Sequence, residues 1–293
     1  MMISKIKTAI NSKWAMPTLF SLAVFFWAID FVDATVCIFA IYVCLVFFLC
    51  EDVKVAFAPI LYIHFFVEYI FYSVANWIVY GTCIALAISS IIYYVIKKLV
   101  EYKKSHKPLK KGKLFWPLVV ADIAYLLGGL IGNFNLLATV MVFAFSLISY
   151  LIYWIAINFC YDLKKYLLYL FICGAIFVSI QILIIHLTSG DIIYSITSRN
   201  YYIGSQNINV AALFLGMGMI ASFSLGYKNK SDYLYFLLSL FFSIMIFVTY
   251  SRMMIFLAVL TLIFYSLVLF KSTKNKRKFM TTFIILFSLI CLF

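Results

Sequence analysis

The sequence predicts an all-α, polytopic transmembrane helix bundle, because apolar residues dominate it and are arranged in long uninterrupted runs. Hydrophobic residues make up 67% of the 293 positions and charged residues 11%. A soluble domain needs more polar surface than this to cover its core. A helix that crosses the bilayer needs about 20 mostly apolar residues, so the chain has room for about ten spans and no separate soluble domain. We therefore expect a single transmembrane domain over residues 1–293.

Eleven apolar runs predict the individual spans. They are apolar on every side, whereas the strands of an outer-membrane barrel alternate apolar and polar positions, so helices are expected. The first run follows Lys5, Lys7 and Lys13 as in a signal peptide, but no small-residue cleavage site follows it, so we expect an uncleaved helix. The expected spans are 14–30, 35–50, 55–72, 77–96, 114–131, 136–160, 166–188, 208–227, 233–249, 253–270 and 279–293.

The basic residues predict the orientation of the bundle. If the N-terminus is cytoplasmic, 21 of the 23 lysines and arginines face inward, eight of them in an expected loop at 97–113. Cytoplasmic loops of membrane proteins carry such an excess of basic residues. The net charge of +13 therefore indicates topology rather than nucleic-acid binding. The expected location is a membrane that the chain crosses many times.

Two basic residues depart from this pattern, and both are arginines although the chain has three arginines and twenty lysines. Arg199 lies in the expected outer loop 189–207, and Arg252 lies at the outer turn between the ninth and tenth spans. Arginine offers a planar, permanently charged fork that binds phosphate or carboxylate through two parallel hydrogen bonds. The alternative interpretation is that each arginine anchors its helix at the membrane interface.

Two short motifs surround these arginines. Residues 199–212 read Arg-Asn-Tyr-Tyr-Ile-Gly-Ser-Gln-Asn-Ile-Asn-Val-Ala-Ala, and residues 249–252 read Thr-Tyr-Ser-Arg, followed by Ala258. A glycine before an Asn-x-x-Ala helix start, and a later Thr-x-Ser-Arg turn, resemble the core of the O-antigen ligase and O-antigen polymerase superfamily. The motifs cover about residues 190–270, and the order and orientation of the expected helices extend the resemblance to the whole chain.

The resemblance implies an envelope polysaccharide polymerase or ligase. Such an enzyme transfers a glycan from an undecaprenyl-diphosphate carrier to an acceptor hydroxyl at the outer face of the membrane, with other polysaccharide-assembly proteins as candidate partners. Carried over to this chain, Arg252 and Arg199 are the catalytic residues that hold the diphosphate, without a metal or cofactor. Ser251 would position the arginine or donate to phosphate, and Asn209 would contact a polar ligand or simply cap its helix.

Other polar residues within or beside the spans are weaker candidates. Glu68, one turn from His64, is a candidate base and substrate contact, although a buried pair of the two side chains is the alternative. Asp191 would orient Arg199 or would be an ordinary loop residue. Gly128 and Gly132 form a small-x-x-x-small pair that suits close helix packing.

Two further functional interpretations stay open. The family carries a large outer loop after its eleventh helix, with a group that activates the acceptor, whereas this sequence stops at Phe293. The chain would then be a truncated, non-catalytic remnant, or its sequence would stop before the native terminus. The second alternative is a transporter or flippase for a lipid-linked sugar or small solute, which few midplane charges and no evident repeat disfavour.

Overall fold

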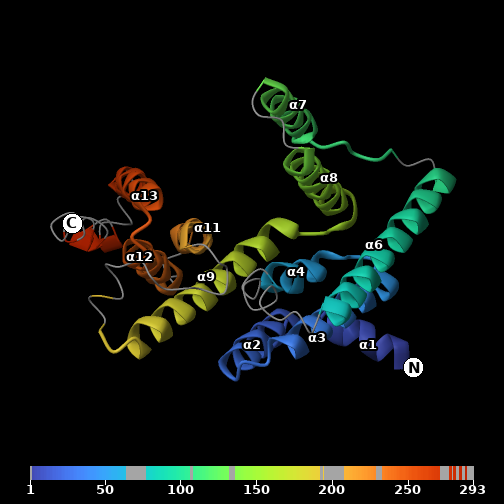
Figure 1. The fold of residues 1–293 in the computed structure, drawn as a ribbon. Helices are drawn as coiled ribbons and strands as arrows, with labels where there is room; N and C mark the ends of the chain where they lie inside the picture. The colour runs from blue at the N-terminus through green and yellow to red at the C-terminus, as the bar shows by residue number, and fades with distance from the viewer. Residues whose placement is uncertain are drawn as a thin grey trace.

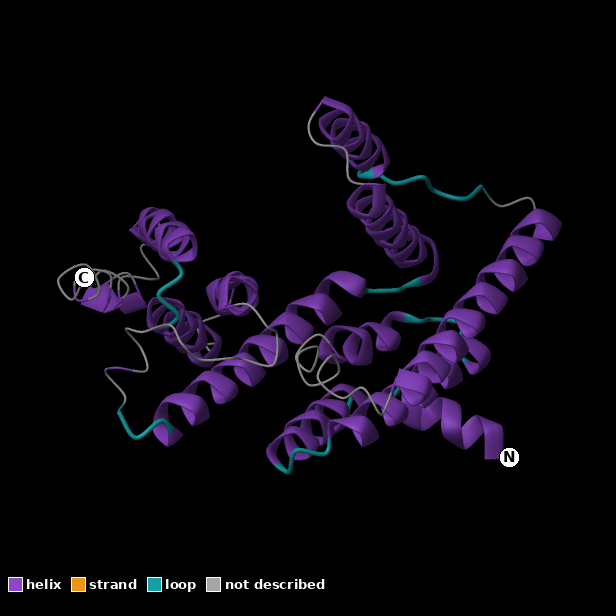
Figure 2. Ribbon diagram, viewed as in Figure 1, coloured by secondary structure: helices purple, strands orange, loops and turns teal. Residues whose placement is uncertain are grey.

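The computed structural model describes residues 2–63, 77–105, 108–131, 136–191, 194, 208–228 and 233–270, together with 277, 278, 280, 281, 284, 285 and 288. All secondary structure in these residues is helical, and Figure 2 shows no strand among them. For this part of the chain the all-α prediction is confirmed.

Figure 1 shows the order of the helices along the chain. The N-terminal half forms α1 (Met2–Ile10), α2 (Ala15–Ala28), α3 (Val32–Leu49), the 3₁₀ turn η1 (Lys54–Ala56), α4 (Phe57–Ile63) and α6 (Trp77–Ser105). The C-terminal half forms α7 (Phe115–Ile131), α8 (Leu136–Phe159), α9 (Leu163–Thr188), α11 (Ile208–Lys228), α12 (Tyr233–Val248) and α13 (Arg252–Phe270).

Five of these helices, α3, α6, α9, α11 and α13, are long and apolar enough to cross a membrane. The shortest of these candidate spans have 18 residues. At about 1.5 Å per residue, such a helix is about 27 Å long, which is close to the thickness of the hydrocarbon core of a bilayer. Shorter apolar helices occur at 15–28, 54–63, 115–128, 146–159 and 233–248. These long apolar helices support the membrane-protein prediction by their length and composition, whereas the count of eleven spans and the orientation stay predictions.

Two features at the ends of helices differ from the sequence-based expectation. Residues 2–10, expected as a segment preceding the first span, form α1, which buries Ile10. The expected loop 97–113 is wrong in its first half, because α6 continues through Ser105. Its last turns carry good helix formers, a Lys98–Glu101 ion pair at 2.7 Å, and lysines that interact favourably with the helix dipole.

The C-terminal parts of α3, α6 and α8 and the start of α9 meet around one hydrophobic cluster that includes Val53, Tyr94 and Phe159. The Tyr94 hydroxyl donates to the backbone oxygen of Glu51 at 2.7 Å. We call this region, built from residues 2–13, 49–56, 94–105, 108–114 and 153–166, the lysine-rich end. Hydrogen bonds between helix ends and loops hold it together.

The largest hydrophobic cluster lies where α9, α11 and α12 pack against each other and against α2 and α4. Gly218 of α11 lies close to α9: an added Cβ would overlap Cβ of Ala175 and would lie 3.2 Å from the backbone oxygen of Phe171. Gly128, predicted to allow close packing, has no such neighbour within 4 Å, and Gly132 lies outside the described residues. The contact glycine is therefore on α11.

We predict that Gly218→Ala destabilises the bundle by about 1–3 kcal/mol, because the methyl group overlaps the backbone and Cβ of α9. The purified chain is heated in detergent, and the measurement is the temperature at which half of its monodisperse size-exclusion peak is lost. Gly81→Ala on α6 is the matched control, because its added Cβ meets nothing within 4 Å. Equal melting of the two variants would contradict the packing of α11 on α9.

Candidate functional site

The turn between α12 and α13 places Arg252 at the first position of α13. Tyr250 in this turn has φ +53°, a left-handed conformation that costs a tyrosine about 1 kcal/mol. Thr249 stabilises the turn from within: its buried hydroxyl donates to the backbone oxygen of Ile246 at 2.6 Å and accepts from the N–H of Ser251 at 3.3 Å. The local sequence thus fixes where α13 begins.

The central contact of the site joins two segments that are 42 residues apart in the sequence. The hydroxyl of Ser251 donates to the side-chain oxygen of Asn209 at 2.7 Å. Ser251 itself is buried, and its backbone oxygen accepts the hydrogen bond from the N–H of Ile255 that starts α13. The first turns of α11 and α13 are therefore linked through their side chains.

The antiparallel packing of α11 and α12 explains why these segments meet. At one end of the pair, Gly226 lies against Phe236; further along, the hydroxyl of Ser243 donates to the sulfur of Met219 at 3.0 Å. The same register continues to the Asn209–Ser251 contact. Because α13 reverses direction after α12, α11 and α13 begin at the same end of the bundle.

This end of the molecule favours a negatively charged ligand. The first N–H groups of a helix have no partner within the helix, and the helix dipole adds partial positive charge there. Arg252 is exposed, and it forms no ion pair within the described part of the chain. Two helix N-termini and one exposed guanidinium can together bind the oxygens of a phosphate or carboxylate.

The structure brings together some of the predicted site residues and leaves others aside. Ser251 and Asn209 are in contact and Arg252 follows directly, whereas Arg199 and Glu68 lie outside the described residues. Asp191 is exposed beyond the end of α9, and its carboxylate accepts the backbone N–H of residue 194 at 2.9 Å.

Asn209 is the second described residue of α11, and its side-chain oxygen accepts a hydrogen bond from Ser251, the residue before α13. Capping of α11 and ligand contact both stay predictions for this side chain. Sequence reasoning missed the part played by Thr249, which fixes the backbone of Ser251. The sequence did contain a signal for this role. Thr249 stands two residues before Ser251 at a helix start, where a threonine hydroxyl can accept a hydrogen bond from a nearby backbone N–H.

The chemistry that the described residues offer here is anion binding by arginine, hydroxyl and amide groups. Among the described residues, no three His, Cys, Asp or Glu side chains lie close enough together to hold a metal ion. Comparison with known proteins adds no further assignment: no protein-family model, no curated protein and no solved structure matches the chain.

We predict a coupling of about 1 kcal/mol between Asn209→Ala and Ser251→Ala in a double-mutant cycle, because each variant removes the same hydrogen bond. The measurement is the unfolding free energy of the four proteins in detergent. Ser266→Ala on α13, whose hydroxyl bonds the oxygen of Leu262 within its own helix, is the control and should be additive with Asn209→Ala. Additivity of the Asn209 and Ser251 variants would show that the two helices do not meet there.

Proposed function

We propose that the chain is a multi-pass protein of the bacterial plasma membrane that transfers a glycan from an undecaprenyl-diphosphate carrier to an acceptor hydroxyl at the outer face. The eleven apolar runs and the cytoplasmic N-terminus belong to this proposal. The observation that carries it is the Asn209–Ser251 contact, which joins two helix N-termini beside Arg252. The same residues carry the resemblance to the O-antigen ligase and polymerase superfamily.

The proposed reaction needs positive charge at the leaving group. The acceptor oxygen attacks C1 of the sugar, the bond from C1 to the diphosphate oxygen breaks, and the diphosphate leaves with the electron pair. Negative charge therefore grows on the diphosphate during the step, and fixed cations there stabilise the transition state more than the bound substrate. The acceptor gives its proton to a base, for which Glu68 is the candidate.

Each proposed residue has a distinct role. Arg252 binds two diphosphate oxygens at once, since its guanidinium is exposed at the end where α11 and α13 begin. Arg199 supplies the second guanidinium, and Asp191 orients it. Ser251 and Asn209 hold the two helix N-termini together, so that their N–H groups point to one ligand.

A lysine at position 252 would keep the charge but lose the fork, because an ammonium group cannot make two parallel hydrogen bonds to a phosphate. The proposal therefore distinguishes a charge requirement from a geometric one. An interface anchor, in contrast, would tolerate lysine, since both side chains reach the headgroups.

We predict that Arg252→Ala lowers glycan transfer by about 100-fold, the loss typical of removing one group that stabilises transition-state charge, and that Arg252→Lys recovers little of it. The assay incubates membranes that contain the chain with an undecaprenyl-diphosphate-linked oligosaccharide, and gels resolve the products by length. Arg277→Ala is the matched control, because Arg277 is an exposed arginine in the segment after α13, on the proposed cytoplasmic side.

Three outcomes would decide between the interpretations. Unchanged product in Arg252→Ala, with equal protein in the membrane, would reject the assigned role. Carrier binding without transfer by the unaltered chain would identify a non-catalytic remnant. Movement of the carrier across a vesicle membrane without glycan transfer would favour the transporter.

A further inference from the structure

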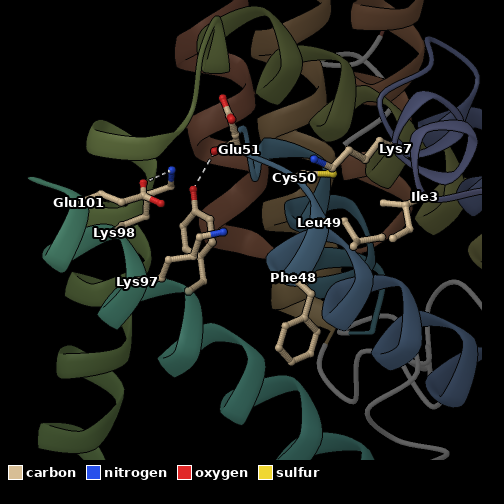
Figure 3. A pocket seen from close by; sticks show the side chains of 10 residues that line it. Ile3, Lys7, Phe48, Leu49, Cys50, Glu51, Lys97, Lys98 and Glu101 are labelled. Atoms are coloured by element: carbon tan, nitrogen blue, oxygen red, sulfur yellow. Dashed lines mark hydrogen bonds and ion pairs between the residues drawn. The ribbon is translucent and has the colours of Figure 1, made fainter. Parts of the chain in front are cut away.

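A cavity of about 200 Å³ opens at the lysine-rich end between α1, α3 and α6 (Figure 3). Figure 3 shows Lys7 of α1 on one side of it, and Lys97 and Lys98 of α6 on the other. Two carboxylates, Glu51 and Glu101, complete the charged lining. The cavity is separate from the site at Arg252, which none of its lining residues contacts.

The charges of this lining do not cancel. Lys98 and Glu101 pair at 2.7 Å, and the ammonium of Lys98 also lies 5.8 Å from the ring centre of Tyr94. Neither Lys7 nor Lys97 forms an ion pair within the described part of the chain. With Glu51 as the one remaining carboxylate of the lining, the cavity keeps an excess of one positive charge.

The position of Lys7 is set by the packing of α1. Ile6 and Ile10 of this helix pack into the cluster at the lysine-rich end, so α1 lies against α3. Asn11, just after α1, donates to the sulfur of Cys50 at 3.5 Å.

Two apolar side chains of the lining are partly uncovered. Ile3 is 60% exposed and Phe48 is 49% exposed, and both stand beside the lysines. Ammonium groups next to uncovered apolar side chains match the headgroup boundary of a bilayer, where phosphates meet acyl chains. A free phosphate or another small soluble anion would leave this apolar wall unused.

We propose that the cavity binds the phosphodiester headgroup of an anionic phospholipid of the phosphatidylglycerol type. Lys7 and Lys97 contact the phosphate oxygens from opposite sides, and the acyl chains run along Ile3 and Phe48. Basic pockets between membrane helices are suited to such headgroups. The proposal requires only that the helices lie in lipid, so it is independent of the proposed glycan transfer.

The test measures lipid retention by native mass spectrometry on the purified full chain in detergent. Phosphatidylglycerol and phosphatidylcholine of the same acyl composition are titrated separately. We expect phosphatidylglycerol to bind preferentially, and Lys7→Ala/Lys97→Ala to weaken its binding about 30-fold, the loss that two lysines at a membrane surface imply. Lys164→Ala/Lys165→Ala is the matched control: it removes the same charge from exposed positions at the start of α9 and should change binding less than threefold.

Two further variants separate binding from folding. Lys7→Arg/Lys97→Arg should retain binding because the charges stay, and Glu51→Gln should strengthen it because a carboxylate beside the phosphate becomes neutral. Equal retention of phosphatidylcholine, an equal loss in the control variant, or complete displacement by glycerol 3-phosphate would each overturn the proposal. The last outcome would identify a soluble phosphate ligand instead.

Discussion

The backbone of an apolar chain must satisfy its own hydrogen bonds wherever lipid replaces water, and this constraint governs the structure. An α-helix meets it within a single segment, whereas an open strand would leave groups unpaired. The described residues are accordingly helical, and irregular backbone is confined to the connections. Polar chemistry is therefore concentrated where helices begin and end. Both the Asn209–Ser251 contact and the lysine-rich cavity follow from this arrangement.

The antiparallel pairing of α11 and α12 connects the two ends of the bundle. At one end it sets Asn209 beside Ser251. At the other it brings Gly226 close to Phe236, and there the buried ammonium of Lys278 donates to the backbone oxygen of Gly226 at 2.5 Å. A shift of α11 along α12 would break both contacts together. The geometry at Asn209 and Ser251 thus depends on packing throughout the helix pair.

The helices could be predicted from the sequence because long apolar runs leave no alternative in lipid. Helix contacts could not: the Asn209–Ser251 bond joins positions 42 residues apart, and only the register of two packed helices brings them together. The spacing of Gly128 and Gly132 gave a wrong prediction of close helix packing for the same reason. An added Cβ at Gly128 would meet open space, whereas one at Gly218 would meet α9. The cavity also escaped prediction, because it needs α1, whose residues do not form an apolar run.

The length of α6 has a consequence for its position in lipid. Its 29 residues extend about 43 Å, whereas α3, its packing partner, has 18 residues and extends about 27 Å. The hydrocarbon core is about 30 Å thick, so α6 must tilt or protrude. The extra length of α6 lies in its C-terminal turns, which carry lysines. Near these turns, the hydroxyl of Tyr94 donates a hydrogen bond to the backbone oxygen of Glu51. A thicker bilayer would therefore submerge charged turns, which couples the protein mechanically to membrane thickness.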